Sequence, residues 1–338
     1  MTKKASAIAN SNIALVKYWG KRNEDLILPY NSSISVTLDK IYTHTTVEFS
    51  ENLKRDILII NDKEIDTQDS EYEEYIGRFL KKLRELYPNK AKNLNAKIVS
   101  KNNFPTAAGL ASSASGFAAL ALACNEALEL NLSKKELSIL ARLGSGSACR
   151  SIYGGFVEWK KGIFEDGRDS YAEQIATKEH WPEFRIVICI TSSKEKKIKS
   201  RAGMKQTVLT SPFYKAWLET IEDDIRLVKK GIIEKDFKLV GSVAELNCLK
   251  MHSTMITTKP PIIYWNGATI EIINLVLRLR EEGIECYFTI DAGPQVKILC
   301  LEEFVKDIVE RVKEMDEIEN IIITSPGDDA KVTNEHLF

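Results

Sequence analysis

The chain has 338 residues, more than one hydrophobic core usually organises, so we expect two lobes. Its composition is that of a globular protein, with 44% hydrophobic and 28% charged residues, and its formal net charge is −1. This balance gives no electrostatic argument for binding nucleic acid or an acidic membrane, and leaves room only for a local basic site.

The N-terminal sequence MTKKASAIAN has no apolar core of signal-peptide length, and the most apolar run, residues 116–124, is too short to span a bilayer. We therefore expect a cytoplasmic protein without a membrane partner. The six cysteines are widely spaced and form no CxxC pair or Cys/His cluster, which argues against zinc. We expect buried free thiols, although the many Lys and Glu residues leave open a heat-adapted source with intracellular disulfides.

The first third of the chain is predicted to be rich in strands. Ile34, Val36 and Leu38 alternate with Ser35 and Thr37, which is the pattern of a half-buried strand.

A further strand is predicted at residues 56–60, followed by a turn at 61–62. Ser70 and Glu73 have the spacing of a capping box, and apolar residues at 76, 79, 80 and 83 follow at helical spacing.

Residues 111–128 are rich in Ala and Leu and predict a buried helix. A second capping box, Ser133 with Glu136, begins a helix that Gly144 would end. A strand is predicted at 154–159.

The second half mixes both kinds of element. Strands are predicted at 185–191, 285–290, 296–301 and 321–324, and helices at 269–282 and 303–313. Ser211 and Pro212 predict the start of another helix, which Gly231 would end. This order predicts an α+β protein of two lobes, with domains at 1–185 and 186–338.

The run PTAAGLASSASG at 105–116 combines small residues, hydroxyls and the start of a helix, as a phosphate-binding loop requires. It is not a Walker A loop, because no GxxxxGK[ST] is present. The alternative is a tight loop before a close-packed helix.

Two other segments carry candidate anion ligands. Lys17 and Lys21 in NIALVKYWGK could pair with carboxylate or phosphate oxygens, or could be solvated lysines at a strand edge. The run GSGSACRS at 144–151 could form an anion-binding nest with the fork of Arg150, or a loop with a surface arginine.

The basic stretch at 194–203, with Ser200 and Arg201, is typical of a solvated loop, and the alternative is a lid that closes over phosphate. Asp291, between two apolar strands, is either a turn-forming residue or a rigidly held general base. The four histidines have no catalytic or metal-site spacing, so we expect them to be structural or exposed.

Together and in this order, these segments resemble the diphosphomevalonate decarboxylases of the GHMP kinase superfamily. The resemblance covers about residues 5–324 and rests on ANSNIALVKYWGKRNEDLILPYNSSISVTL, NNFPTAAGLASSASGFAALA, GSGSACRSIYGGFVEW, SRAGMKQTV, MHSTM, PPIIYW and YFTIDAGPQVKIL. One departure is Gln295, since the family commonly has Asn after DAGP, and this puts the local turn in doubt.

The resemblance implies a GHMP kinase fold, with an N-terminal lobe like ribosomal protein S5 domain 2 and a ferredoxin-like C-terminal lobe. It implies that ATP and (R)-5-diphosphomevalonate give ADP, phosphate, CO2 and isopentenyl diphosphate, with Mg²⁺. It also implies a homodimer.

Site residues follow from the resemblance. Asp291 would orient or deprotonate the 3-hydroxyl, and Lys17 would pair with Asp291. Arg150, the third expected catalytic residue, would hold the carboxylate and hydroxyl region of the substrate together with Asn12. The expected substrate ligands are Asn12, Tyr18, Lys21, Ser145, Ser147, Arg150, Ser200 and Arg201. The expected ATP ligands are Ser100, Asn102, Pro105, Ala107, Ala108, Gly109, Leu110, Ala111, Ser112 and Ser113, of which Ser112 and Ser113 would also lie near the metal.

Four alternatives stay open. The first alternative is a phosphomevalonate decarboxylase, an enzyme with a related substrate. The presence of Lys21, Ser145, Ser147 and Arg201 favours a diphosphate substrate over a monophosphate. A mevalonate 3-kinase is expected to lack the Asp/Lys pair, and an inactive relative to lack intact Asp291, Lys17 and Arg150. An RNA-binding module is disfavoured by the neutral charge.

Overall fold

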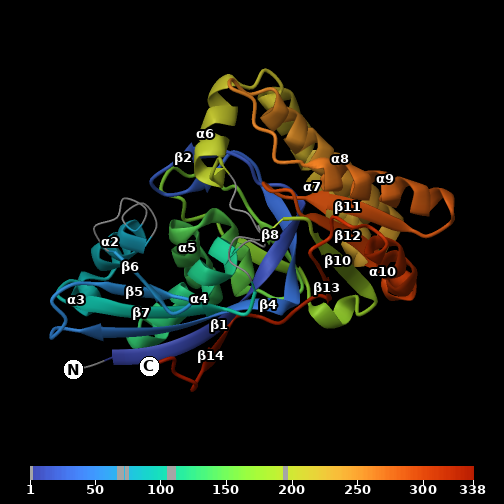
Figure 1. Ribbon diagram of the computed structural model, residues 1–338. Helices are drawn as coiled ribbons and strands as arrows, with labels where there is room; N and C mark the ends of the chain where they lie inside the picture. The colour runs from blue at the N-terminus through green and yellow to red at the C-terminus, as the bar shows by residue number, and fades with distance from the viewer. Residues whose placement is uncertain (1–2, 67–71, 73–75, 105–111, 193–196) are drawn as a thin grey trace.

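The computed structural model describes residues 3–66, 72, 76–104, 112–192 and 197–338, which form two lobes side by side (Figure 1). Each lobe combines an antiparallel or mixed sheet with helices, as the α+β prediction required. None of the helices in this part of the chain has the length and hydropathy that a membrane span needs.

The N-terminal lobe is built on a sheet that has eight strands within the described residues, in the order β14-β1-β4-β7-β5-β6, with β8 paired to β4 and β9 paired to β8. The strands are β1 (Lys3–Val16), β4 (Ser33–Ser50), β5 (Ile57–Ile60), β6 (Lys63–Ile65), β7 (Asn95–Asn102), β8 (Phe156–Trp159), β9 (Ala172–Ala176) and β14 (Lys331–Thr333). A short hairpin, β2 (Lys21–Asn23) with β3 (Leu28–Pro29), follows β1. The predicted strands at 56–60 and 154–159 are confirmed.

The prediction of a half-buried strand at Ile34–Leu38 is wrong in one respect, because Ser35 and Thr37 are also fully buried. The polar face is covered by the segment after α5: Ser35 Oγ accepts from Arg150, and Thr37 Oγ1 donates to the Tyr153 carbonyl. The polar residues of the alternating pattern therefore face a buried polar cluster instead of solvent.

The helices of the N-terminal lobe are α2 (Arg78–Leu86), α3 (Pro88–Ala91), α4 (Ser112–Ala127) and α5 (Lys134–Gly144), followed by the 3-10 helix η3 (Gly146–Ile152). The buried helix α4 and the capping box of Ser133 with Glu136 are confirmed. The predicted capping box of Ser70 with Glu73 lies outside the described residues.

Gly144 is the last residue of α5, and packing against α4 requires a glycine there. A Cβ there would lie 2.0 Å from Cδ1 of Phe117 on α4, so only glycine allows this approach. The chain then turns directly into η3.

The C-terminal lobe has a four-stranded sheet within the described residues, in the order β11-β12-β10-β13, and every pair is antiparallel. Its elements are β10 (Phe184–Ile190), α6 (Ser200–Thr210), α7 (Tyr214–Glu234), α8 (Phe237–Ile256), α9 (Gly267–Glu281), β11 (Cys286–Ile290), β12 (Val296–Leu301), α10 (Val305–Lys313) and β13 (Asn320–Thr324), with short 3-10 turns η4 (Lys178–His180) and η5 (Glu302–Phe304). The predicted strands and the helices at 269–282 and 303–313 are confirmed.

Two details of this lobe were predicted wrongly. Helix α7 begins at Tyr214 without a side-chain cap, so Ser211 and Pro212 do not begin it. Gly231 lies inside α7, where a Cβ would come 2.7 Å from a methyl of Val240 on α8, so the glycine serves helix packing. Helices α6 and α8 and strand β14 were not predicted.

One hydrophobic cluster spans both lobes, and each lobe also has a cluster of its own. Ile13 of β1 and Ile34 of β4 pack in the same buried cluster as Ile186 of β10 and residues of α7 and α8. Strand β14 returns to pair with β1, and Lys4 of β1 donates to the carbonyl of Phe338 at 3.1 Å. The domain division at residue 185 stays a prediction. All six cysteines are buried free thiols, as expected.

Candidate active site

The ends of two strands from different lobes bring Lys17 and Asp291 together. Lys17 follows β1, Asp291 follows β11, and Lys17 Nζ lies 2.7 Å from Asp291 Oδ1. A second lysine, Lys297 of β12, lies 3.5 Å from Oδ2. Both lysines are 1% exposed, whereas the Asp291 side chain is 28% exposed, so the carboxylate is the part of the triad that a substrate can reach.

The charge of Asp291 is set by this pairing. Burial alone raises the pKa of Asp291, but the ammonium groups of Lys17 and Lys297 outweigh it and hold the pKa below its ordinary value. Burial also lowers the pKa of Lys297, against the attraction of Asp291. Asp291 is therefore an anion at neutral pH and a weak base.

The backbone of Lys17 is held from both lobes. Asn247 of α8 accepts from the Lys17 N–H at 2.8 Å, and Asn31 donates to the Lys17 carbonyl at 2.8 Å. Asn247 is oriented in turn by a 2.7 Å hydrogen bond to Asp224 of α7, which also pairs with Lys250. These contacts fix where the Lys17 side chain starts.

Hydroxyl and amide oxygens hold the guanidinium of Arg150, which lies on η3. Its guanidinium donates to Ser35 Oγ at 2.9 Å, to Ser33 Oγ at 2.5 Å and to Asn12 Oδ1 at 3.2 Å. Asn12 lies at a bulge in the β1–β4 pairing and donates to Ser151 Oγ at 2.8 Å. No carboxylate in the described residues forms an ion pair with Arg150, although Asp291 raises its pKa against the lowering caused by burial. A buried cation of this kind is suited to an anionic ligand.

A second cationic region follows Lys17 in the chain. Lys21 is 8% exposed, and the Tyr18 hydroxyl is buried without a hydrogen-bond partner among the described residues. Burial raises the pKa of Tyr18, so its hydroxyl stays a donor. Gly20, at φ 105°, makes the turn between them, where a Cβ would lie 2.0 Å from the Tyr214 hydroxyl.

Other donors border this region. Arg201 of α6 donates to the Gly144 carbonyl at 2.7 Å. Ser145 Oγ lies 3.3 Å from Ser113 Oγ and 3.5 Å from Ser147 Oγ, which brings the first turn of α4 to η3. Nε and Nη2 of Arg78 are buried without partners in the described structure.

Ser112 and Ser113 are the first two described residues of α4, and the N-terminal end of a helix favours an anion. Pro105, Ala107, Ala108, Gly109, Leu110 and Ala111 lie outside the described residues. Ser100 and Asn102 are on β7, where their side chains bond Thr45 and Thr43.

The described residues contain no group of three or more His, Cys, Asp or Glu side chains that could hold a metal. Mg²⁺ is commonly held by one or two protein oxygens with substrate phosphates and waters. The hydroxyls of Ser112 and Ser113 fit that pattern.

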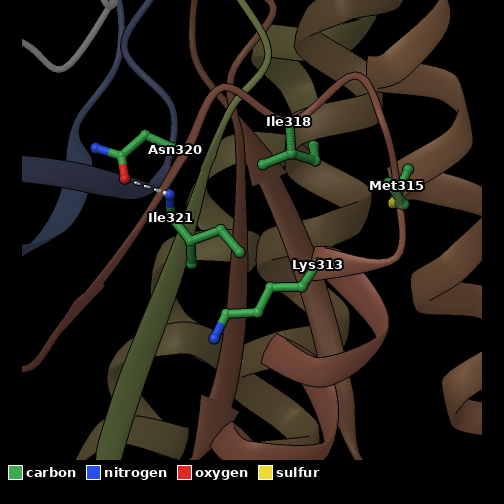
Figure 2. A pocket seen from close by; sticks show the side chains of 5 residues that line it. All are labelled: Lys313, Met315, Ile318, Asn320 and Ile321. Carbon is green, nitrogen blue, oxygen red and sulfur yellow. Dashed lines mark hydrogen bonds between the residues drawn. The ribbon is translucent and has the colours of Figure 1, made fainter.

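A hollow of about 270 Å³ lies elsewhere, between the end of α10 and the start of β13 (Figure 2). Lys313, Met315, Ile318, Asn320 and Ile321 line it, and none of them is a predicted site residue. It therefore plays no part in the site.

The comparisons with known proteins agree over nearly the whole chain. A family model described as diphosphomevalonate decarboxylase-like N-terminal domain matches residues 9–172, and one described as mevalonate 5-diphosphate decarboxylase C-terminal domain matches residues 186–334. The chain belongs to the diphosphomevalonate decarboxylase family. Its fold is accordingly the GHMP kinase fold that the resemblance implied.

Individual relatives are similar over most of their length. The diphosphomevalonate decarboxylase of Candida albicans is 43% identical over 302 residues, covering 87% of this chain and 83% of that protein. The crystal structure of the Staphylococcus aureus mevalonate diphosphate decarboxylase is 42% identical, with a TM-score of 0.92 and 99% of each chain covered. A structure described as MDDEF in complex with MVAPP, AMPPCP and magnesium is 43% identical, with a TM-score of 0.91, covering 98% of this chain and 99% of that one.

For this decarboxylase family member, the structure brings together Asp291, Lys17, Arg150 and Asn12. Ser200 and Arg201 do not lie in a loop, since they form the first turn of α6. His252 is buried and bonded to the Ile290 carbonyl at 3.2 Å, and burial lowers its pKa to about 3, so it stays neutral.

The sequence analysis missed the residues that support these groups: Asn31, Arg78, Asn247 and Lys297. Lys297 had a visible signal, because it is a lone cation inside the apolar strand VKILCL. Asn247 had none, because α8 itself was not predicted. Gln295 anchors the turn instead of the family's Asn by accepting from the Thr191 N–H at 2.6 Å.

Proposed function

We propose that this protein catalyses the ATP-dependent decarboxylation of (R)-5-diphosphomevalonate to isopentenyl diphosphate, through phosphorylation of the 3-hydroxyl. The observation that carries the proposal is the 2.7 Å pair of Lys17 with Asp291, beside a buried Arg150 that has no carboxylate partner among the described residues. The relatives' shared activity and the neighbour with MVAPP, the ATP analogue AMPPCP and magnesium support the same reaction.

Asp291 is the group proposed to receive the 3-hydroxyl. Its carboxylate accepts the hydroxyl hydrogen and directs the oxygen toward the γ-phosphorus of ATP. Because the pKa of Asp291 is low, it is suited to orienting the hydroxyl, with proton transfer late as the O–P bond forms. The Lys17 ammonium stabilises negative charge on the transferring phosphoryl group.

Arg150 is proposed to hold the substrate carboxylate, with Asn12 at the hydroxyl side. Once the 3-oxygen is phosphorylated, the C3–O bond breaks and phosphate leaves with its electron pair. The C1–C2 bond then supplies the pair for the C2=C3 double bond, and CO2 departs. A carboxylate held by a buried cation is positioned for this step without a protein base.

Tyr18, Lys21, Ser145, Ser147 and Arg201 are proposed to bind the diphosphate. The buried Tyr18 hydroxyl has no hydrogen-bond partner among the described residues, which supports this role, since an anionic oxygen would satisfy it. Ser200 stands at the N-terminus of α6, and Arg78 adds two buried nitrogens that have no hydrogen-bond partner in the described part of the chain.

Ser112 and Ser113, with the 105–111 segment, are proposed to bind the ATP phosphates, and Ser100 and Asn102 to lie near the adenine. Mg²⁺ would neutralise charge on the phosphates. The α4 N-terminus favours the same charge through its free N–H groups.

The assembly is proposed to be a homodimer in the cytoplasm. The six free thiols support a reducing compartment. Sedimentation of the purified protein tests the dimer, and a monomer at micromolar concentration would refute it.

A comparative assay tests the function. The purified protein receives ATP, Mg²⁺ and either mevalonate, phosphomevalonate or diphosphomevalonate, and ADP and CO2 are followed separately. We expect CO2 in step with ADP on diphosphomevalonate alone. Equal turnover of phosphomevalonate would assign the monophosphate reaction, and ADP without CO2 would make the protein a kinase.

Asp291→Asn is the matched variant for the catalytic pair. It keeps the shape and removes the charge, so we expect turnover to fall about a thousandfold or more while substrate binding persists. Binding is measured by calorimetry with diphosphomevalonate. Retained turnover would remove Asp291 from the mechanism.

A further inference from the structure

A carboxylate occupies the cationic region proposed for the diphosphate. Glu24, just after β2, places Oε2 2.5 Å from the buried Nζ of Lys21. Burial raises the pKa of the Tyr18 hydroxyl, and the negative charge of Glu24 raises it further. The Glu24 side chain is 52% exposed, so it can swing into solvent, whereas the Lys21 side chain is 3% exposed and cannot.

The surroundings of Lys21 are strongly basic. Arg201 and Arg78 both act on Lys21 by like-charge repulsion, and Arg78 also donates to the Glu24 backbone carbonyl at 3.3 Å. Burial lowers the pKa of Lys21, and Glu24 opposes that effect. Bringing cations together is electrostatically costly, and among the described residues Glu24 is the carboxylate that pairs with Lys21.

We propose that Glu24 is a displaceable counter-ion that holds Lys21 before substrate binds and competes with the substrate diphosphate for this lysine. The inference rests on the proposed function and names a residue that sets affinity and selectivity for ligand charge. A ligand must displace the carboxylate, so a diphosphate with its greater charge does so better than a monophosphate.

The matched pair of variants is Glu24→Gln and Asp25→Asn. Asp25 is the next residue, carries the same charge and pairs with Lys82 of α2 at 2.7 Å, with its side chain 63% exposed. Both variants change the net charge by one, and only the first acts on Lys21.

At fixed ionic strength and neutral pH, we expect Glu24→Gln to lower KM for diphosphomevalonate about tenfold and to leave kcat nearly unchanged. The inhibition constant of inorganic pyrophosphate should fall by a similar factor, and the preference for diphosphate over monophosphate should narrow. Asp25→Asn should change none of these.

The pH profile gives a second readout. Without Glu24, the pKa of Lys21 falls further, so the rise of KM at alkaline pH should begin at lower pH than in the parent protein. If Glu24 had a purely structural role, its replacement would not change the pH at which KM begins to rise.

Several results would overturn the inference. A raised or unchanged KM in Glu24→Gln would mean that Glu24 positions Lys21 productively, and an equal fall in both variants would mean a long-range charge effect. If the parent protein does not turn over diphosphomevalonate, the proposed function fails, while direct calorimetric titration of the parent and both variants with inorganic pyrophosphate still decides the role of Glu24.

Discussion

Replacing Lys297 by Met removes one of the two ammonium groups that flank Asp291 and leaves a side chain of similar length in the same apolar strand. The Lys297 side chain is 1% exposed and lies 3.5 Å from Asp291 Oδ2, while its other acceptor is the Gln295 carbonyl at 3.2 Å. The change therefore acts on the charge and orientation of Asp291, and reaches substrate only through it.

The magnitude follows from the geometry. Unit charges 3.5 Å apart interact by about 5 kcal/mol at an effective dielectric constant of about 20. The exposure of Asp291 lets solvent screen this to about half. Since about 1.4 kcal/mol corresponds to one pH unit, we expect the acidic limb of kcat to move up by about one to two units.

The sign follows from the pKa of Asp291. In the parent protein two cations hold that pKa below its ordinary value, so Asp291 stays ionised well into the acidic range. In Lys297→Met only Lys17 opposes the effect of burial, so the pKa of Asp291 is higher than in the parent protein. Protonation of Asp291 then removes activity at a higher pH. At neutral pH, kcat should fall about tenfold because Oδ2 is no longer held, and KM should change less than about twofold.

The assay is steady-state ADP release between pH 5 and 9. Lys306→Met is the control, since Lys306 is in the same lobe and its side chain is 83% exposed. An acidic limb that coincides in the parent and Lys297→Met proteins would refute this account of the site. So would a shift that Lys306→Met reproduces.

Two further predictions concern support and packing. Asn247→Ala should lower kcat about tenfold with little change in KM, because the Lys17 N–H loses its 2.8 Å acceptor; a proportionate rise in KM would argue against a positioning role. Gly144→Ala should lower the free energy of unfolding by about 1–3 kcal/mol, because its Cβ meets Phe117 at 2.0 Å; an unchanged urea midpoint would contradict this.

Local structure was largely predictable from sequence. The Ser133–Glu136 capping box and the turn at Asn61–Asp62, where both residues have positive φ, depend on residues close in the chain. The boundaries of β11 and β12 followed from apolar runs ended by the Asp291 turn. The failures at Ser211 and Gly231 arose where contacts between helices overrode local signals.

The chemistry of the site was determined by the sequence only as a set of candidates. Lys17, Arg150 and Asp291 could be named from their motifs, but each also had an ordinary structural interpretation. What distinguishes them is burial beside one another, and the hydrogen bond from Lys17 to Asp291 joins residues 274 positions apart. No periodicity encodes a contact of that span.

The sequence by itself determined the family, the reaction class and most strands and helices, because these depend on motifs and on periodic apolar residues. The tertiary structure alone decided that Lys297 flanks Asp291, that Asn247 holds Lys17 and that Glu24 faces Lys21. The reason is physical: the state and orientation of a charged side chain depend on the charges and water around it. Those are fixed only when the two lobes pack together.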